Sequence, residues 1–145
     1  MINDDLKLTG HVSIALNDKV VQEIPNLVVT AGKNWVANRM KGATPSQDPM
    51  SHMAIGTGNT TVSSTDTTLD TELDRNALTS TTVTDSSVAY VATWSAGDGT
   101  GAIIEAGLFD DSSSGDMLAR TVFSSGIVNK GSSDSLTITW TITVS

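Results

Sequence analysis

Residues 135–145 alternate between hydroxyl-bearing and apolar side chains without interruption. The apolar positions are Leu136, Ile138, Trp140, Ile142 and Val144, and Ser or Thr occupies every position between them. Successive side chains of a β-strand point to opposite faces, and Trp, Ile, Val and Thr suit a pleated surface. The pattern therefore predicts a C-terminal strand with one apolar face that other strands must cover.

Shorter runs of the same kind recur along the chain. Alternation predicts a strand over residues 6–16, and a turn at Asn17–Asp18 leads to a return strand over 19–24. Further strands are expected at 52–56, 77–84, 88–95, 102–109 and 117–124. Roughly eight or nine short strands with turns every 8–12 residues indicate an all-β fold. We expect residues 1–145 to form a single antiparallel β-sandwich domain, jelly-roll-like, with a short N-terminal lead at residues 1–5.

One segment has the character of a helix. Trp35, Val36 and Met40 recur at helical spacing, and Thr30 precedes them as a residue able to cap the first turn. Gly42 is a suitable residue for the end of the helix. These features predict one short helix near residues 31–40.

The composition narrows the classes of function. The chain has 145 residues, a net charge of −8, no cysteine and two histidines. An acidic protein is a poor partner for nucleic acid or an anionic membrane surface, and no apolar run approaches the roughly 20 residues of a membrane span. The acidic lead lacks the features of a signal peptide. We therefore expect a disulfide-free protein with no nucleic-acid or membrane partner.

Two loops carry residues that occur in ligand sites. Gly97–Gly101 is glycine-rich like a phosphate-binding loop, but a β-type run follows it in place of a helix. We expect a hairpin turn there. Asp110, Asp111 and Asp116 offer oxygen ligands for calcium. Their spacing departs from the EF-hand pattern, so a solvated loop is the favoured interpretation.

Glu105 is the one acidic residue inside an apolar run, between Ile104 and Ala106. A carboxyl group in such surroundings is either catalytic, with a raised pKa, or paired with a buried cation. Arg120, on the next predicted strand, is the available partner. We favour an ion pair.

The remaining candidates are two histidines and three tryptophans. His11 and His52 accompany no nucleophile motif of the Gly-x-Ser-x-Gly kind. Trp35, Trp94 and Trp140 could stack on sugar rings, but each lies in an amphipathic pattern that favours the core. We assign no catalytic, cofactor-binding or metal-binding residue, and we do not expect an enzyme.

Seven segments of the chain form an ordered series over about residues 7–144: 26–34, 53–58, 66–73, 75–80, 100–109, 117–123 and 135–144. This series resembles a family of small virion proteins of tailed bacteriophages, described as head decoration, cement or tail-fibre-associated proteins. The segment 103–109 is also similar to fibre proteins that attach to tail baseplates.

This resemblance implies a structural protein of the virion, assembled in the cytoplasm of the bacterial host. The first hypothesis is a capsid decoration protein that binds the major capsid protein on the outer surface of the head. The alternative is a tail fibre or baseplate-associated protein, which could also carry a host-carbohydrate-binding surface. Proteins of this kind are commonly homo-oligomers, with a trimer favoured, and the lead and residues 43–51 are the segments free to reach a neighbouring subunit.

Overall fold

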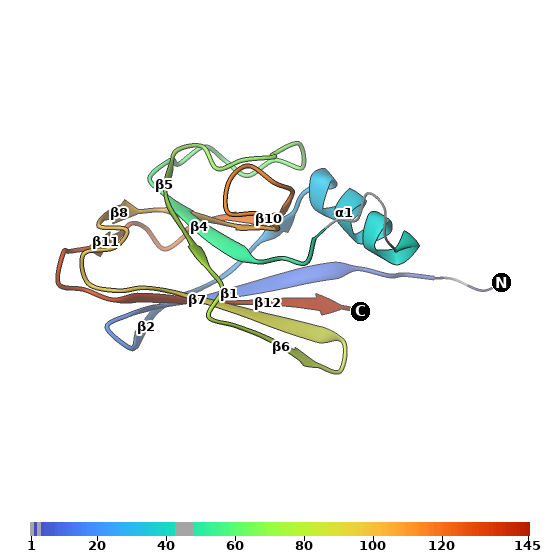
Figure 1. Cartoon of the computed structure of the whole chain (residues 1–145), viewed down its shortest axis with the longest axis horizontal. Coiled ribbons are helices and arrows are strands. Elements are labelled where there is room, and N and C mark those ends of the chain that lie inside the picture. The colour runs from blue at the N-terminus through green and yellow to red at the C-terminus, as the bar shows by residue number, and fades with distance from the viewer. Residues whose placement is uncertain (1, 3, 43–47) are drawn as a thin grey trace.

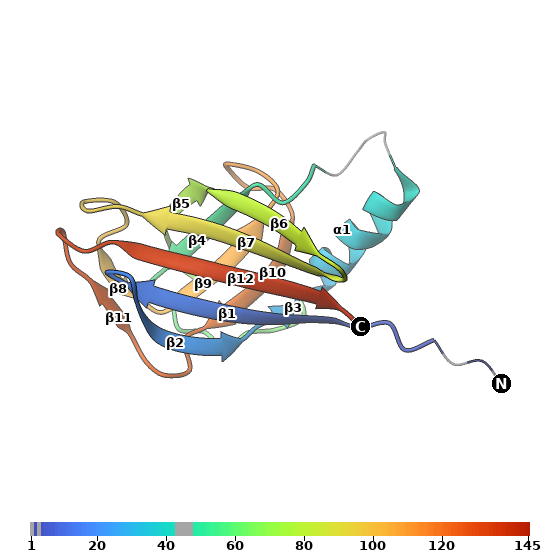
Figure 2. The same ribbon diagram turned by 90° about the horizontal axis from the view of Figure 1, so that it is seen from below.

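The computed structural model describes residues 2, 4–42 and 48–145. Two five-stranded antiparallel sheets pack face to face, and a small two-stranded sheet lies at one end (Figures 1 and 2). This arrangement confirms the predicted all-β sandwich with one short helix. No helix of the described residues is long and apolar enough to cross a membrane. The predicted loop at 43–51 lies partly outside the described residues.

The first sheet has the strand order β2-β1-β12-β7-β6. Its members are β2 (Lys19–Pro25), β1 (Leu8–Leu16), β12 (Leu136–Val144), β7 (Ser87–Trp94) and β6 (Ser80–Thr84). The C-terminal strand is thus central and pairs with β1 and β7 along its whole length.

The second sheet has the order β3-β10-β9-β4-β5, and β11 pairs with β8 apart from it. The strands are β3 (Leu27–Val28), β10 (Met117–Val122), β9 (Glu105–Phe109), β4 (His52–Gly56), β5 (Glu72–Ala77), β8 (Gly101–Ile103) and β11 (Val128–Lys130).

The alternation in β12 has the predicted consequence. Ile138 and Trp140 are fully buried between the two sheets. On the opposite face, hydroxyl groups pair across strands, with 3.1 Å between the Oγ1 atoms of Thr93 and Thr137. This face is half-exposed, so the strand supplies core packing on one side and a polar surface on the other.

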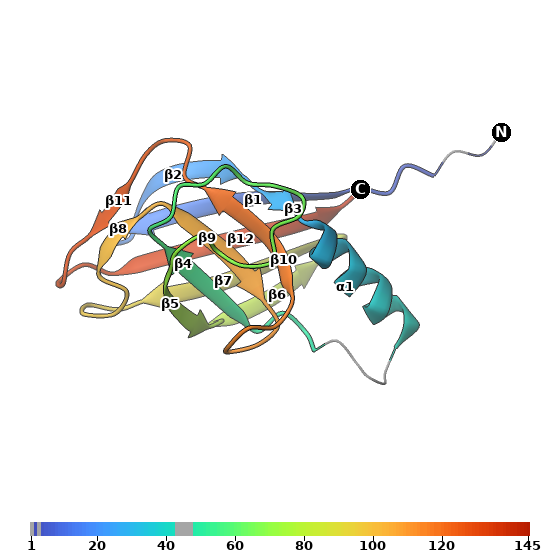
Figure 3. The ribbon, with the colours of Figure 1, turned by 90° about the horizontal axis from the view of Figure 1, so that it is seen from above.

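Helix α1 (Thr30–Lys41) lies against the second sheet, beside β10 (Figure 3). The predicted cap was wrong by one residue: Val29 is the N-cap, and no side chain caps the first turn. Gly42 ends the helix with a φ of 87°, as predicted. Gly32 is the only described residue of the helix that is buried, because the helix backbone approaches the carbonyl group of Leu118 directly.

The expected number of strands was too low. The described residues contain twelve strands. Some apolar runs that were predicted to form one strand form two in the structure. The run at 102–109 breaks at Ile104, where the chain leaves β8 for β9. Residues 77–84 likewise contain the end of β5 and the start of β6, which belong to different sheets.

Of two predicted hairpin turns, one is confirmed. Asn17 and Asp18 both have positive φ angles, 51° and 64°, and join the paired strands β1 and β2. The turn at Gly97–Gly101 is not a hairpin, because it connects β7 of the first sheet to β8, which pairs with β11. The alternation of side chains does not show whether two strands joined by a turn also pair with each other.

Replacing Gly32 by Ala tests the contact between α1 and β10. Alanine favours a helix over glycine by about 1 kcal/mol, but the added methyl group would overlap the Leu118 carbonyl group. We expect Gly32→Ala to lower the free energy of unfolding by about 2 kcal/mol in urea denaturation. The exposed Asn38→Ala variant is the control and should stabilise slightly. A stabilising Gly32→Ala would show that the helix is not held at this distance.

Candidate functional site

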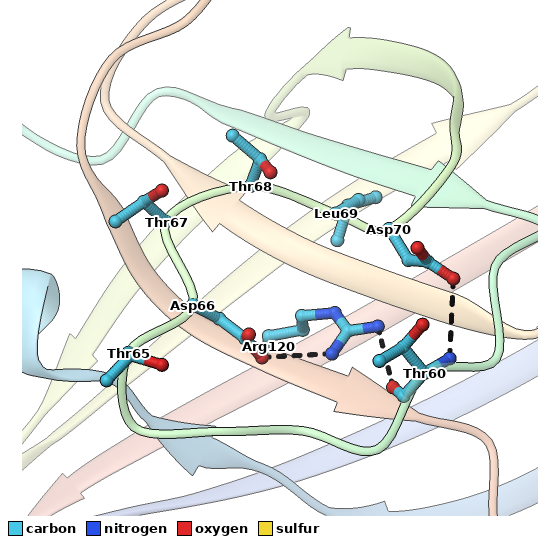
Figure 4. Close-up of a pocket in the computed structure, with 8 residues that line it drawn as sticks. All are labelled: Thr60, Thr65, Asp66, Thr67, Thr68, Leu69, Asp70 and Arg120. Carbon is cyan, nitrogen blue, oxygen red and sulfur yellow. Dashed lines mark hydrogen bonds and ion pairs between the residues drawn. The ribbon is translucent and has the colours of Figure 1, made fainter.

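A threonine-rich loop, residues 57–71, covers the outer face of the second sheet between β4 and β5 (Figure 1). It encloses a polar recess of about 330 Å³, whose floor includes Arg120 (Figure 4). The exposed rim carries the hydroxyl groups of Thr60, Thr65, Thr67 and Thr68. Because this recess combines a buried charge with an ordered loop, it is the first candidate for a functional site.

Glu105 lies beneath the loop and is fully buried. Its carboxylate accepts hydrogen bonds from three backbone N–H groups of the loop region: Gly58 at 3.1 Å, Asp70 at 3.0 Å and Thr71 at 2.7 Å. A buried carboxylate requires such partners, because desolvation of an unpaired charge is very costly. Glu105 therefore fixes both ends of the loop to β9.

Arg120 completes the cluster from the neighbouring strand β10. Its Nε and Nη2 atoms donate to Glu105 Oε2 at 3.1 and 2.8 Å, which confirms the predicted ion pair. Nη1 donates to Asp66 Oδ2 at 2.9 Å, and Nη2 donates to the carbonyl group of Thr60 at 3.0 Å. The two strands are antiparallel neighbours with Arg120 opposite Gly107, so the two side chains meet diagonally on one face.

The electrostatics of the cluster favour a permanent charge on Arg120. Burial alone lowers the pKa of this guanidinium group, but the hydrogen bonds from Arg120 to Glu105 and Asp66 outweigh it and raise the pKa above its usual value. Four hydrogen bonds occupy most of the five N–H donors. Glu105 likewise has several donors around both oxygens, so the pair acts as a clamp and offers no free base to a substrate.

The loop is also held by apolar and polar contacts of its own. Leu69 is buried in a small apolar cluster on the outer face of the second sheet, together with Phe109. The carbonyl group of Ser64 accepts a hydrogen bond from the N–H of Thr30, at the first residue of α1, at 2.8 Å. Asp70 faces Thr60, and the hydrogen bond from the Thr60 side chain lowers the pKa of Asp70. The exposed hydroxyl groups are therefore presented on a backbone with a defined shape.

The two histidines belong to different sheets and do not form a common site. His11 lies on β1, where Nε2 is 3.6 Å from Glu23 Oε1 at an exposed position. His52 lies on β4, and its Nδ1 is 2.8 Å from Ser51 Oγ. His11 and His52 therefore lie in separate surroundings.

The aspartate loop closes on itself. Asp110 Oδ1 accepts a hydrogen bond from the N–H of Asp116 at 2.6 Å, and Asp111 Oδ1 accepts one from Ser113 at 3.3 Å. Burial raises the pKa of Asp110, whereas the Ser113 backbone hydrogen bond lowers that of Asp111. Nowhere in the described part of the chain do three or more acidic or histidine residues gather as metal ligands.

Two of the three tryptophans lie in the core, as the amphipathic pattern predicted. Trp94 and Trp140 are fully buried, and Trp140 Nε1 donates to Asn26 Oδ1 at 3.0 Å. Trp35 on α1 is half-buried, and its Nε1 donates to the carbonyl group of Asp48 at 2.9 Å. Only Trp35 remains as an aromatic side chain of this set with an accessible face.

The sequence pattern does not indicate the role of Arg75. Its Nη1 donates to the carbonyl groups of Asp111 at 3.0 Å and Ser114 at 2.9 Å, and its guanidinium group lies 3.8 Å from the ring centroid of Phe109. Nη2 pairs with Glu72 Oε1 at 2.6 Å. These partners are mostly distant in sequence, so only the folded arrangement of β5 and β9 brings them together.

A second polar cluster was also missed. Asn76 Nδ2 donates to Asp98 Oδ2 at 2.8 Å and to the carbonyl group of Thr93 at 2.9 Å. Burial raises the pKa of Asp74, and a hydrogen bond shared with Asp98 raises it further. Asp74 is therefore protonated more readily than an isolated aspartate would be.

Glu105→Gln tests whether the buried pair holds the loop. The amide would place an NH₂ group among N–H donors and leave the Arg120 charge without its main partner, so we expect a loss of about 3–5 kcal/mol in unfolding free energy. Hydrogen exchange should accelerate at the amides of Gly58, Asp70 and Thr71. The exposed Glu23→Gln variant is the control and should change stability by less than about 0.5 kcal/mol. Unchanged exchange at the three amides would contradict the clamp.

Asp74→Asn tests the carboxyl pair through pH. A pKa raised in the folded state means that the contribution of Asp74 to stability is present below its unfolded value of 3.8 and is lost as pH rises through the folded value. We expect Asp74→Asn to raise the Tm at pH 7, with the gain shrinking as pH falls toward about 3.5. Asp85→Asn, in the β6–β7 turn, should follow the parent protein at both pH values. A gain from Asp74→Asn that is equal at both pH values would refute the raised pKa of Asp74.

Comparison with models of protein families, with curated proteins and with solved structures finds no match to this chain. The site that emerges is a polar loop of fixed shape, clamped by a buried ion pair to a rigid sandwich.

Proposed function

We propose that this chain is a structural protein of a bacteriophage virion, and specifically a capsid decoration protein that binds the outer surface of the head and stabilises it. The observation that carries the proposal is the Glu105–Arg120 clamp, which uses a fully buried ion pair to fix a surface loop. A buried ion pair that holds a loop in place maintains the shape of a protein surface and does not catalyse a reaction. The ordered series of segments similar to phage virion proteins supports the same class.

Charge distribution fits a protein on a DNA-filled particle. The net charge is −8, and three of the cations are buried and engaged inside the protein: Arg75, Arg120 and Lys130. A protein of this character has little attraction to nucleic acid. The lack of cysteine matches assembly in a reducing bacterial cytoplasm.

The surface for the major capsid protein is proposed at the β1–β2 hairpin end of the sandwich. An apolar patch there, which we call the hairpin-end patch, consists of Leu16, Val21 and Ile127. It borders a groove of about 340 Å³, and Gln22 holds its two sides together by donating to the carbonyl group of Gly126 at 2.7 Å. Val21 and Ile127 are 43% and 54% exposed, so burial against a shell subunit would remove them from water.

The alternative is a tail fibre or baseplate-associated protein with a host-carbohydrate-binding surface. The fibre-like segment at residues 103–109 contains β9, whose residues are all buried, so its likeness concerns the core and not a contact surface. Trp35 is the remaining aromatic candidate for a sugar contact. The decoration proposal has the stronger support because it requires no aromatic platform.

Binding to shells that lack this protein tests the proposal. We expect the purified protein to sediment with such shells, and Ile127→Glu to weaken binding at least about tenfold, because it places a charge in an apolar contact. Val83→Glu is the matched control: Val83 is 69% exposed on β6, and its register with Val88 and Ile142 places it away from the β1–β2 turn, so the variant should bind like the parent. Sedimentation with purified tails and not with shells would favour the alternative. Binding to neither would count against both.

A further inference from the structure

The end of the sandwich that carries α1 has a groove of its own. The α1-end groove has a volume of about 470 Å³ and lies between the start of β1, the end of β12 and the helix. Leu8, Val36 and Val144 provide apolar walls, and Lys7 and Lys33 flank them. Val144 is 37% exposed and Leu6, at the entrance, is 73% exposed. None of the described residues covers this apolar surface, so it is open to solvent.

The groove is lined by basic side chains, whereas the protein as a whole is acidic. The chain carries 16 acidic and eight basic residues, yet the side chains that line the groove include two lysines and no carboxylate. The electrostatic preference of the groove is therefore for an acidic segment, and its walls favour an apolar side chain.

The N-terminal lead has the complementary chemistry. Ile2 is 91% exposed, and Asp4 and Asp5 follow it on an exposed stretch. The lead runs away from the sandwich at the same end as α1 (Figures 2 and 3). One apolar side chain next to two carboxylates matches an apolar groove flanked by two ammonium groups.

Geometry directs the lead to a neighbouring copy. Leu6 already belongs to the wall of the groove, so Ile2 would reach its own groove only if the chain reversed within three residues. Four extended residues span up to about 14 Å, which is enough to cross to an adjacent subunit. The described residues of the lead, Ile2, Asp4 and Asp5, are all exposed, and the two aspartates border a shallow recess beside Ser145.

We propose that the lead of one copy docks in the α1-end groove of the next copy, with Ile2 between Leu8, Val36 and Val144 and with Asp4 and Asp5 near Lys7 and Lys33. The contact joins two different surfaces, the lead of one copy and the groove of the next, so it closes into a ring when the rotation between copies permits, as in a trimer. This assembly leaves the hairpin-end patch open. It goes beyond the proposed function and holds for a protein of the head or of the tail.

Cysteine cross-linking tests the contact directly, because the chain has no cysteine of its own. Ile2→Cys protein and isotopically heavy Val36→Cys protein are mixed and oxidised, so that a mixed disulfide is intermolecular by construction. We expect it to form at least about tenfold faster than the mixed disulfide of Ile2→Cys with Val20→Cys at the far end, because docking raises the effective concentration. Equal rates for the two pairs would overturn the proposal.

A charge exchange tests the complementarity without cysteines. Lys33→Glu should weaken self-association about tenfold at low salt in analytical ultracentrifugation, and combining it with Asp4→Lys and Asp5→Lys should restore much of the affinity. Lys19→Glu, at the β1–β2 turn, is the control and should have no effect on association beyond that of net charge. A parent protein that remains monomeric at about 100 μM, or a triple variant weaker than Lys33→Glu alone, would overturn the proposal.

Discussion

The buried pair of Glu105 and Arg120 is the interaction on which the outer half of this protein depends. A carboxylate with no exposure to water and a guanidinium group at 1% side-chain exposure sit beneath a polar loop, and either charge alone would be very unfavourable there. Together they hold the two ends of residues 57–71 through backbone amides and a carbonyl group. The loop in turn covers the apolar cluster of Leu69 and Phe109. Such a pair contributes more to a single defined conformation of the loop than to the net stability of the folded protein.

Sequence reasoning worked where the information was local. Alternation predicted β12 and its buried face, and Glu105 and Arg120 were recognisable as partners because consecutive strands usually pair. It failed where the fold joins distant segments. The residues next to Glu105 in the sequence do not show that the backbone amides of Gly58 and Thr71 donate hydrogen bonds to its carboxylate. The helix cap was misplaced by one residue because Val29 is held by the sheet and not by a side-chain hydrogen bond.

The two ends of the sandwich have different chemistry, and this difference organises the proposed assembly. The β1–β2 end presents an apolar patch with Val21 and Ile127, which suits a shell subunit. The α1 end presents an apolar groove between Lys7 and Lys33, which suits an acidic segment such as the lead. A rigid sandwich with two separate contact surfaces can bind its own kind and the shell at once. The clamped threonine loop then faces away from both ends, on the outer side of the second sheet.

Cryo-electron microscopy of intact virions that carry a labelled copy of this protein is the most direct measurement. A decoration protein predicts label on the outside of the head, at regular positions between subunits of the major capsid protein, with the hairpin-end patch toward the shell. Label confined to the tail or baseplate, with the head bare, would contradict that role.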